Sequence, residues 1–192
     1  MFAVVVVSKI VAFLDKISIF SSKLSQIALW ILAILIFSLS IALNFSFVSS
    51  KLDDFSLYCF AFMVLFAFGF CLKEDKHVRV DLLYANYSPR FKTLSFIFVN
   101  LFFILPFSLI LVKYSFDFTL QSYKIAEASP NGRIPYYFIF KTFFILGFLL
   151  LALQSIAEVL KAALKLKEHK YKQINAIDEE VQHIKESMDL RV

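Results

Sequence analysis

Residues 27–48 read IALWILAILIFSLSIALNFSFV, a run of 22 residues without a charged side chain. A helix needs about 20 consecutive apolar residues to cross the hydrocarbon core of a bilayer, so this run is long enough to span a membrane. Outward from it, three more segments pass the same test: 55–72, 93–112 and 136–160. The sequence therefore predicts an all-α, integral membrane four-helix bundle over residues 27–160.

The composition of the chain agrees with this prediction. Of its 192 residues, 60% are hydrophobic and 18% are charged, and the mean hydropathy is +0.75. A soluble domain has about 45–50% apolar and about 25% charged residues. Four spans also leave too few residues for a large extramembrane domain, so the apolar excess belongs in lipid.

Few residues are suited to chemistry. The chain has only three glycines, which argues against a phosphate-binding loop, and His77, His169 and His183 lie outside the predicted spans. Cys59 and Cys71 lack histidine neighbours and are expected to be small apolar fillers. We therefore predict no enzyme activity, no cofactor and no metal site. The net charge of +5 lies mostly on connections rather than along one amphipathic face, so no nucleic-acid partner is expected.

The distribution of Lys and Arg predicts the orientation. Fifteen of the 20 basic residues lie in residues 1–26, in the connection between the second and third spans, or in the C-terminal tail. Loops rich in Lys and Arg stay in the cytoplasm. Both termini are therefore predicted to be cytoplasmic.

Three segments outside the spans have helical patterns. Residues 1–26 are apolar but interrupted by Lys9, Asp15, Lys16 and Lys23, which predicts an amphipathic helix lying in the interface and leading into the first span. Residues 75–88 predict a second interfacial helix, on the cytoplasmic side. Residues 161–192 predict a cytoplasmic helical tail, either a solvated amphipathic extension or a small coiled-coil contact.

Polar residues at the spans need partners, because unpaired polar groups are costly in lipid. Asn44 and Asn100 are expected to bond across helices. Pro106 lies inside the third span and can kink it. Glu158 and Lys161 are expected to form an ordinary surface pair at the end of the fourth span.

Lys141 has two alternatives near the start of the fourth span. Its side chain could snorkel outward, or it could pair with Asp117 or Glu127 from the preceding connection. Gln154 lies thirteen residues further along the same helix, and at about 100 degrees per residue the two side chains point in different directions. Lys141 and Gln154 are therefore not expected to form one site.

The connection over residues 116–135 is the most polar segment between two spans. Pro130, Asn131 and Gly132 predict a turn within it. By the charge distribution this connection faces the periplasm. From the residues alone, it could be a simple polar connector or a functional surface.

Four motifs, taken together, resemble a known family. They are LKEDKHVRVDLLY at 72–84, SPR at 88–90, EASPNG at 127–132 followed by Pro135 and Lys141, and GFLLLALQ at 147–154. Their order and spacing resemble the small permease subunit of tripartite ATP-independent periplasmic (TRAP) transporters. The similarity covers residues 55–161.

The resemblance implies a small membrane subunit, multi-pass in a bacterial inner membrane with membrane lipid around it. It implies two protein partners: a large permease subunit that holds the sodium and substrate sites, and a periplasmic substrate-binding protein. The small subunit would scaffold the large one during gradient-driven symport of an organic acid. The resemblance also selects family-motif or interface candidates: Arg79, Asp81, Glu127, Ser129, Pro130, Gly132, Pro135, Lys141 and Gln154.

Two hypotheses follow from this family. The dense phenylalanines of spans 55–72 and 93–112 would present a surface to lipid or to the partner. Glu127, Ser129, Arg133 and Lys141 would organise a periplasmic corner that a partner touches. The alternative functions are a self-associating small channel, which would need a polar helix face that no span offers, and an accessory subunit of another membrane complex.

Overall fold

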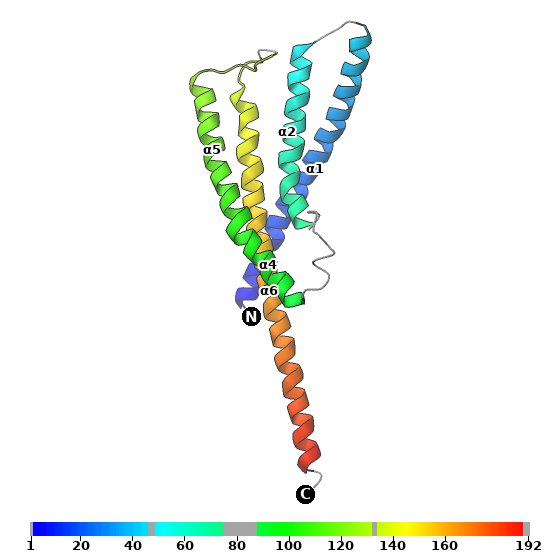
Figure 1. The fold of residues 1–192 in the computed structure, drawn as a ribbon, viewed down its shortest axis with the longest axis vertical. Helices are drawn as coiled ribbons and strands as arrows, with labels where there is room; N and C mark the ends of the chain where they lie inside the picture. Colours follow the sequence, from blue (N-terminus) through cyan, green and yellow to red (C-terminus); the bar gives the residue numbers. More distant parts are fainter. Residues whose placement is uncertain (1, 46–48, 75–87, 132–133, 190–192) are drawn as a thin grey trace.

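The computed structural model describes residues 2–45, 49–74, 88–131 and 134–189, and every regular element in these ranges is a helix (Figure 1). The elements are α1 (Phe2–Asn44), α2 (Ser50–Lys73), α4 (Pro89–Val99), the π-helical turn η1 (Asn100–Ile104), α5 (Leu105–Lys124) and α6 (Phe138–Asp189). Four helical stretches are long and apolar enough to cross a membrane: Val5–Asn44, Ser50–Lys73, Arg90–Lys124 and Phe138–Lys167. The predicted all-α fold with four membrane helices is confirmed.

α6 is the central helix of the fold. It packs against α1, α2, α4, η1 and α5, whereas α1 packs mainly on α2. Figure 1 shows the α1–α2 and α5–α6 connections at one end of the molecule, which we call the loop end, and both chain termini at the other. An even number of spans requires this arrangement.

Serine side chains bring α1 and α2 close together. Ser21 Oγ donates to the Phe66 carbonyl at 2.7 Å, and Ser25 Oγ donates to the Met63 carbonyl at 2.7 Å. Lipid is as apolar as the helices, so helix association in a membrane depends on close packing and interhelical hydrogen bonds. These serines supply both, and they hold the middle of α1 against α2.

Small residues also allow close helix packing on α5 and α6. A Cβ atom at Gly147 would lie 2.6 Å from Leu65 Cβ, so only glycine lets α2 and α6 approach this closely. Serines spaced seven residues apart on α5 are all buried: Ser108, Ser115 and Ser122. This spacing keeps them on one side of the helix. Small side chains therefore mark the inner faces of α5 and α6.

The third membrane helix changes its winding before Pro106. Proline lacks an N–H and crowds the carbonyl four residues earlier, and the wider turn of η1 ends just before it. Asn100, in this turn, is 1% exposed and donates to the Phe96 carbonyl at 2.9 Å. Ser155 Oγ on α6 donates to the Asn100 carbonyl at 3.1 Å. The same hydroxyl lies 3.4 Å from Asn100 Oδ1, which accepts from it, so the predicted side-chain bond from Asn100 to another helix is confirmed.

Several expected boundaries differ from the observed ones. α1 runs without a break past residue 26, so residues 2–26 continue directly into the first span. α5 extends to Lys124, so the expectation of a connection over 116–135 is wrong for 116–124, which are helical. α6 continues to Asp189 and includes most of the expected tail. Asn44 is exposed and donates to the Ser40 carbonyl of its own helix at 3.0 Å, so its expected bond to another helix is wrong.

The predicted interfacial helix at 75–88 lies outside the described residues except for Ser88. Ser88 Oγ accepts from the Phe91 N–H at 3.3 Å and so caps α4, with Pro89 in the first helical turn. Both features are typical helix-start signals.

Candidate functional site

Polar side chains, several of them buried, gather at two places along the helices. The loop-end cluster consists of Asp54, Glu127, Ser129, Asn131 and Lys141. The α1–α6 cluster, toward the ends that carry the termini, consists of Asp15, Gln154, Glu158 and Lys161. Because polar groups within a membrane protein are costly unless paired, such clusters are the first candidates for function.

The backbone after α5 positions the loop-end cluster. Two bonds end the helix: Ala126 N–H donates to the Tyr123 carbonyl at 3.2 Å, and Glu127 N–H donates to the Ser122 carbonyl at 3.1 Å. This pair of bonds is the Schellman motif, in which the residue that donates the first of the two bonds has a left-handed backbone conformation. Ala126 fills that position with φ of 47°. The motif fixes the direction in which Glu127 leaves the helix.

Lys141 is the buried cation of the loop-end cluster. It lies in the first turn of α6, is 4% exposed, and its Nζ is 2.6 Å from Glu127 Oε2. The same Nζ lies 3.6 Å from the Phe118 ring centre and 4.8 Å from that of Tyr137. Cation–π contacts of this kind stabilise a desolvated ammonium group. Of the two alternatives for Lys141, pairing with Glu127 is therefore observed rather than snorkelling.

Glu127 is the more accessible partner, with 30% of its side chain exposed. Its pKa is lowered from the usual value of 4.5, first because Lys141 donates a hydrogen bond to its carboxylate. The ion pair therefore persists at neutral pH. Tyr137 N–H also donates to the Glu127 carbonyl at 3.2 Å, which ties the loop to the start of α6.

Asp54 connects the loop to α2. It is 2% exposed, and its carboxylate accepts Ser129 Oγ at 2.6 Å and Asn131 Nδ2 at 3.0 Å. Ser129 Oγ in turn accepts the Ile134 N–H at 2.9 Å, which closes the loop on itself. Sequence analysis selected Ser129 but missed Asp54. The available signal was a second acidic residue, next to Asp53, directly before an apolar run.

The α1–α6 cluster joins the first helix to the last. Asp15 Oδ1 accepts Gln154 Nε2 at 3.1 Å and Lys161 Nζ at 2.7 Å. Glu158 Oε1 accepts the same two donors at 2.8 Å and 2.7 Å. Glu158 is 7% exposed. The expectation that Glu158 and Lys161 form an ordinary surface pair is therefore wrong, because α1 covers them and supplies a second carboxylate.

The structure separates the sequence-selected residues into groups. Glu127, Ser129 and Lys141 lie together in the loop-end cluster, and Gln154 lies in the other cluster, so Lys141 and Gln154 are in different sites, as their helical angle predicts. Pro130 and Pro135 are exposed in the α5–α6 connection. Three selected residues lie outside the described residues: Arg79, Asp81 and Gly132, together with Arg133.

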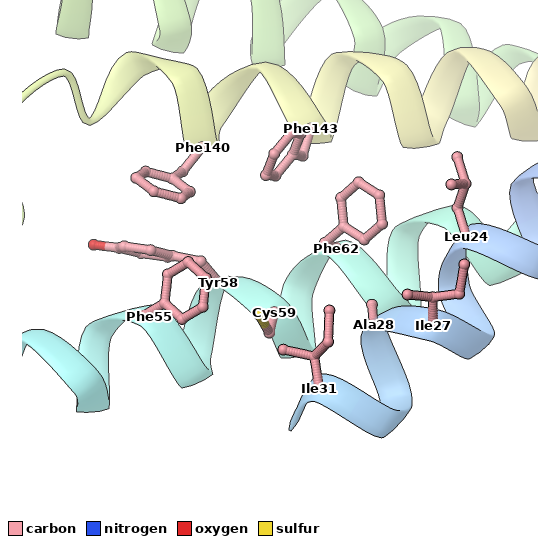
Figure 2. A pocket seen from close by; sticks show the side chains of 10 residues that line it. All are labelled: Leu24, Ile27, Ala28, Ile31, Phe55, Tyr58, Cys59, Phe62, Phe140 and Phe143. Carbon is pink, nitrogen blue, oxygen red and sulfur yellow. The ribbon is translucent and has the colours of Figure 1, made fainter. Parts of the chain in front are cut away.

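An apolar pocket of about 250 Å³ lies between α1, α2 and α6. Figure 2 shows Tyr58 facing Phe140 and Phe62 beside Phe143, whereas Cys59 points toward α1, beside Ile31. Cys59 and Cys71 are both free thiols. Within the described ranges, no three His, Cys, Asp or Glu side chains are grouped to hold a metal ion.

These features define a class of protein: an integral membrane protein whose ionic groups join its own helices. The family model for the DctQ component of tripartite ATP-independent periplasmic transporters matches residues 32–165. The chain therefore belongs to this family and is a TRAP transporter small permease, a transporter component and not an enzyme. No curated protein and no solved structure matches the chain.

Proposed function

We propose that this small permease is the fixed scaffold of an importer in a bacterial inner membrane, with both termini in the cytoplasm. Its partners would be a large permease subunit and a periplasmic binding protein that delivers the substrate. Transport would be symport of an organic acid driven by a cation gradient, with sodium as the cation. In this role the small subunit carries no transport site of its own.

The observation that supports a scaffold is the internal pairing of buried charges. Lys141 is paired with Glu127, and Lys161 with Asp15 and Glu158, so these charges connect helices to one another. An ion-conducting subunit instead needs polar groups turned toward a water-filled path. The pocket between α1, α2 and α6 is lined by apolar and aromatic side chains (Figure 2).

The loop-end cluster is the second part of the proposal. Lys141 is enclosed, but Glu127 and the exposed Asn131 reach the surface at the loop end. We infer that this corner touches the binding protein or the large permease. Its ion pair and its bonds to Asp54 would hold the contact surface in one shape, since a preorganised surface loses less entropy on binding.

One experiment tests the scaffold. The tagged chain is purified from native membranes in mild detergent, and the proteins that co-purify in stoichiometric amount are identified by mass spectrometry. A large multi-span permease in equal amount is the expected result. Recovery of the chain only with copies of itself would contradict the scaffold and favour a self-associating channel.

The corner is tested by uptake of the transported acid in whole cells. Glu127→Gln keeps an acceptor for Lys141 but removes the charge, so uptake should fall while membrane abundance stays constant. Glu74→Gln is the matched control, because Glu74 is exposed and follows the last residue of α2, at the end of that helix away from the loop end. Normal uptake in Glu127→Gln would show that the charge at this corner does not contribute to transport.

A further inference from the structure

A second pocket, of about 380 Å³, lies where α1 and α2 diverge toward the loop end. Asp53, Asp54 and Asn131 line one end of it, and Ile36, Leu57 and Phe60 line the rest of its length. Neither the proposed scaffold role nor the loop-end cluster explains this combination. Oxygen-bearing side chains at one end and apolar walls at the other are suited to an amphipathic ligand.

The position of the lining residues indicates the depth of the pocket. Asp53 is in the first turn of α2, which begins at Ser50, whereas Phe60 lies seven residues further along. At 1.5 Å per residue, the pocket therefore extends about 10 Å along the helix. The acidic end is level with the start of a membrane span, where lipid headgroups lie, and the apolar end is level with the upper acyl chains.

We propose that this pocket binds a phospholipid whose headgroup carries a primary ammonium group, such as phosphatidylethanolamine. The ammonium would donate to the Asp53 carboxylate, with Asp54 and the Asn131 amide oxygen as neighbouring acceptors. One acyl chain would lie along Leu57, Phe60 and Ile36. A primary ammonium has three N–H donors, and the pocket offers oxygen acceptors on four side chains: Asp53, Asp54, Ser56 and Asn131.

The depth of the exposed apolar walls favours lipid over a soluble protein partner. The exposed fractions of Ile36, Leu57 and Phe60 are 55%, 60% and 50%, so these side chains face outward from membrane-spanning helices. A soluble protein at the loop end could reach Asp53 but not Phe60, which lies deeper in the span. A phospholipid reaches both depths, with its headgroup at Asp53 and an acyl chain at Phe60. The acyl chain would fill the groove and pack against its apolar side chains.

Asp53 is the residue on which recognition depends. The Asp54 carboxylate is already committed to Ser129 and Asn131, so its main effect on a headgroup is its charge. Asp53 is exposed at the mouth of the pocket. Phosphatidylcholine has no N–H donor and phosphatidylglycerol has no cation, so both should bind less well than phosphatidylethanolamine.

The test uses the full chain, purified and delipidated in mild detergent, with native mass spectrometry as the readout. Phosphatidylethanolamine, phosphatidylcholine and phosphatidylglycerol with identical acyl chains are titrated separately. We expect phosphatidylethanolamine to be favoured about two- to fivefold, the range that an exposed ion pair supplies. Asp53→Asn should abolish that preference. Asp117→Asn, which removes an exposed carboxylate on α5, should leave it unchanged.

A second pair of variants tests the apolar wall. Phe60→Ala should weaken binding of all three lipids, whereas Phe102→Ala should not, at a phenylalanine in η1 that is 61% exposed against 50% for Phe60. Equal binding of the three lipids by the natural chain, or a preference that survives Asp53→Asn, would overturn the proposal. Loss of the large permease from Asp53→Asn membranes with lipid preference intact would also overturn it and assign the pocket to a basic protein side chain.

Discussion

The buried ammonium group of Lys141, in the first turn of α6, is stabilised by its ion pair with Glu127. Replacing Lys141 with Met removes the cation and leaves Glu127 without its ion-pair partner, although the partly exposed carboxylate can regain water. We expect Lys141→Met to lower the free energy of unfolding by about 1–2 kcal/mol, less than for a fully buried pair. Thermal unfolding in detergent measures this loss. Lys113→Met, at an exposed lysine of α5, is the control.

The same pair predicts a dependence on pH. Because the pKa of Glu127 is lowered in the folded protein, its contribution to stability is fully present above the usual value of 4.5 and is lost as the pH falls through the lowered pKa. A double-mutant cycle of Lys141→Met and Glu127→Gln should therefore show coupling at pH 7 that shrinks below pH about 4. Coupling that is absent at pH 7 would contradict the ion pair.

Ala126 holds a backbone conformation that glycine adopts more easily. Its φ of 47° places its Cβ close to backbone atoms, at a position where glycine is the usual residue. Ala126→Gly should raise the free energy of unfolding by about 0.5–1 kcal/mol, because relief of this strain exceeds the added entropy of the unfolded chain. The melting temperature in detergent is the measurement, and a lower value would show that Ala126 is not strained.

At the scale of elements, the crossing of α2 and α6 depends on one glycine. A Cβ at Gly147 would lie 2.6 Å from Leu65 Cβ, an atom that side-chain rotation cannot move. Gly147→Ala should therefore destabilise the protein by about 1–3 kcal/mol, the usual range for an overpacked core. Thermal unfolding in detergent gives the value.

Two further variants show whether the effect comes from this contact. Gly69→Ala meets Ser18 Oγ at 3.0 Å, and a serine side chain can rotate away, so this change should be milder. Adding Leu65→Ala should recover part of the stability lost in Gly147→Ala. Equal losses for the two glycine variants would indicate a general effect of glycine replacement rather than a clash with Leu65.

Apolar runs predict where these helices cross lipid but not where they end. The charge-free run at 93–112 identified the third span, yet its helix continues to Lys124, because polar residues are also able to form helix. Likewise, Lys9, Lys16 and Lys23 suggested a separate helix before the first span, whereas α1 is continuous. Hydropathy indicates which residues favour lipid. Helical hydrogen bonds form between backbone groups whatever the hydropathy of the side chains, so hydropathy does not locate the helix ends.

The candidate site was predicted only in part for a related reason. Glu127, Ser129 and Lys141 are close in sequence and belong to recognisable motifs. Their partner Asp54 and the Asp15 of the other cluster lie 75 and 146 residues from the groups they bind, Ser129 and Lys161. Such contacts arise from helix packing, which no local pattern encodes.

At the scale of the whole molecule, the structure divides the phenylalanines that were expected to face lipid or a partner. On α2, Phe62 and Phe66 stack at 4.0 Å between ring centres and pack against Phe143, so they belong to the core. In η1 and α5, three phenylalanines are 60–61% exposed: Phe102, Phe103 and Phe107. These three are more exposed than Phe55, Phe60 and Phe98 of the same two spans, at 41%, 50% and 53%, so they are the first candidates for a partner surface.

These three residues give the last prediction. Replacing Phe102, Phe103 and Phe107 together by Leu keeps the surface apolar, so insertion into lipid should be unchanged, but the shape and area that aromatic rings supply to a contact are lost. We expect the triple variant to reach the membrane at normal abundance and to co-purify with less of the large permease. Trp30→Leu with Phe37→Leu, at 72% and 68% exposed positions on α1, is the matched control. If the triple variant retains the permease fully, this face meets lipid, and the partner surface lies elsewhere on the small subunit.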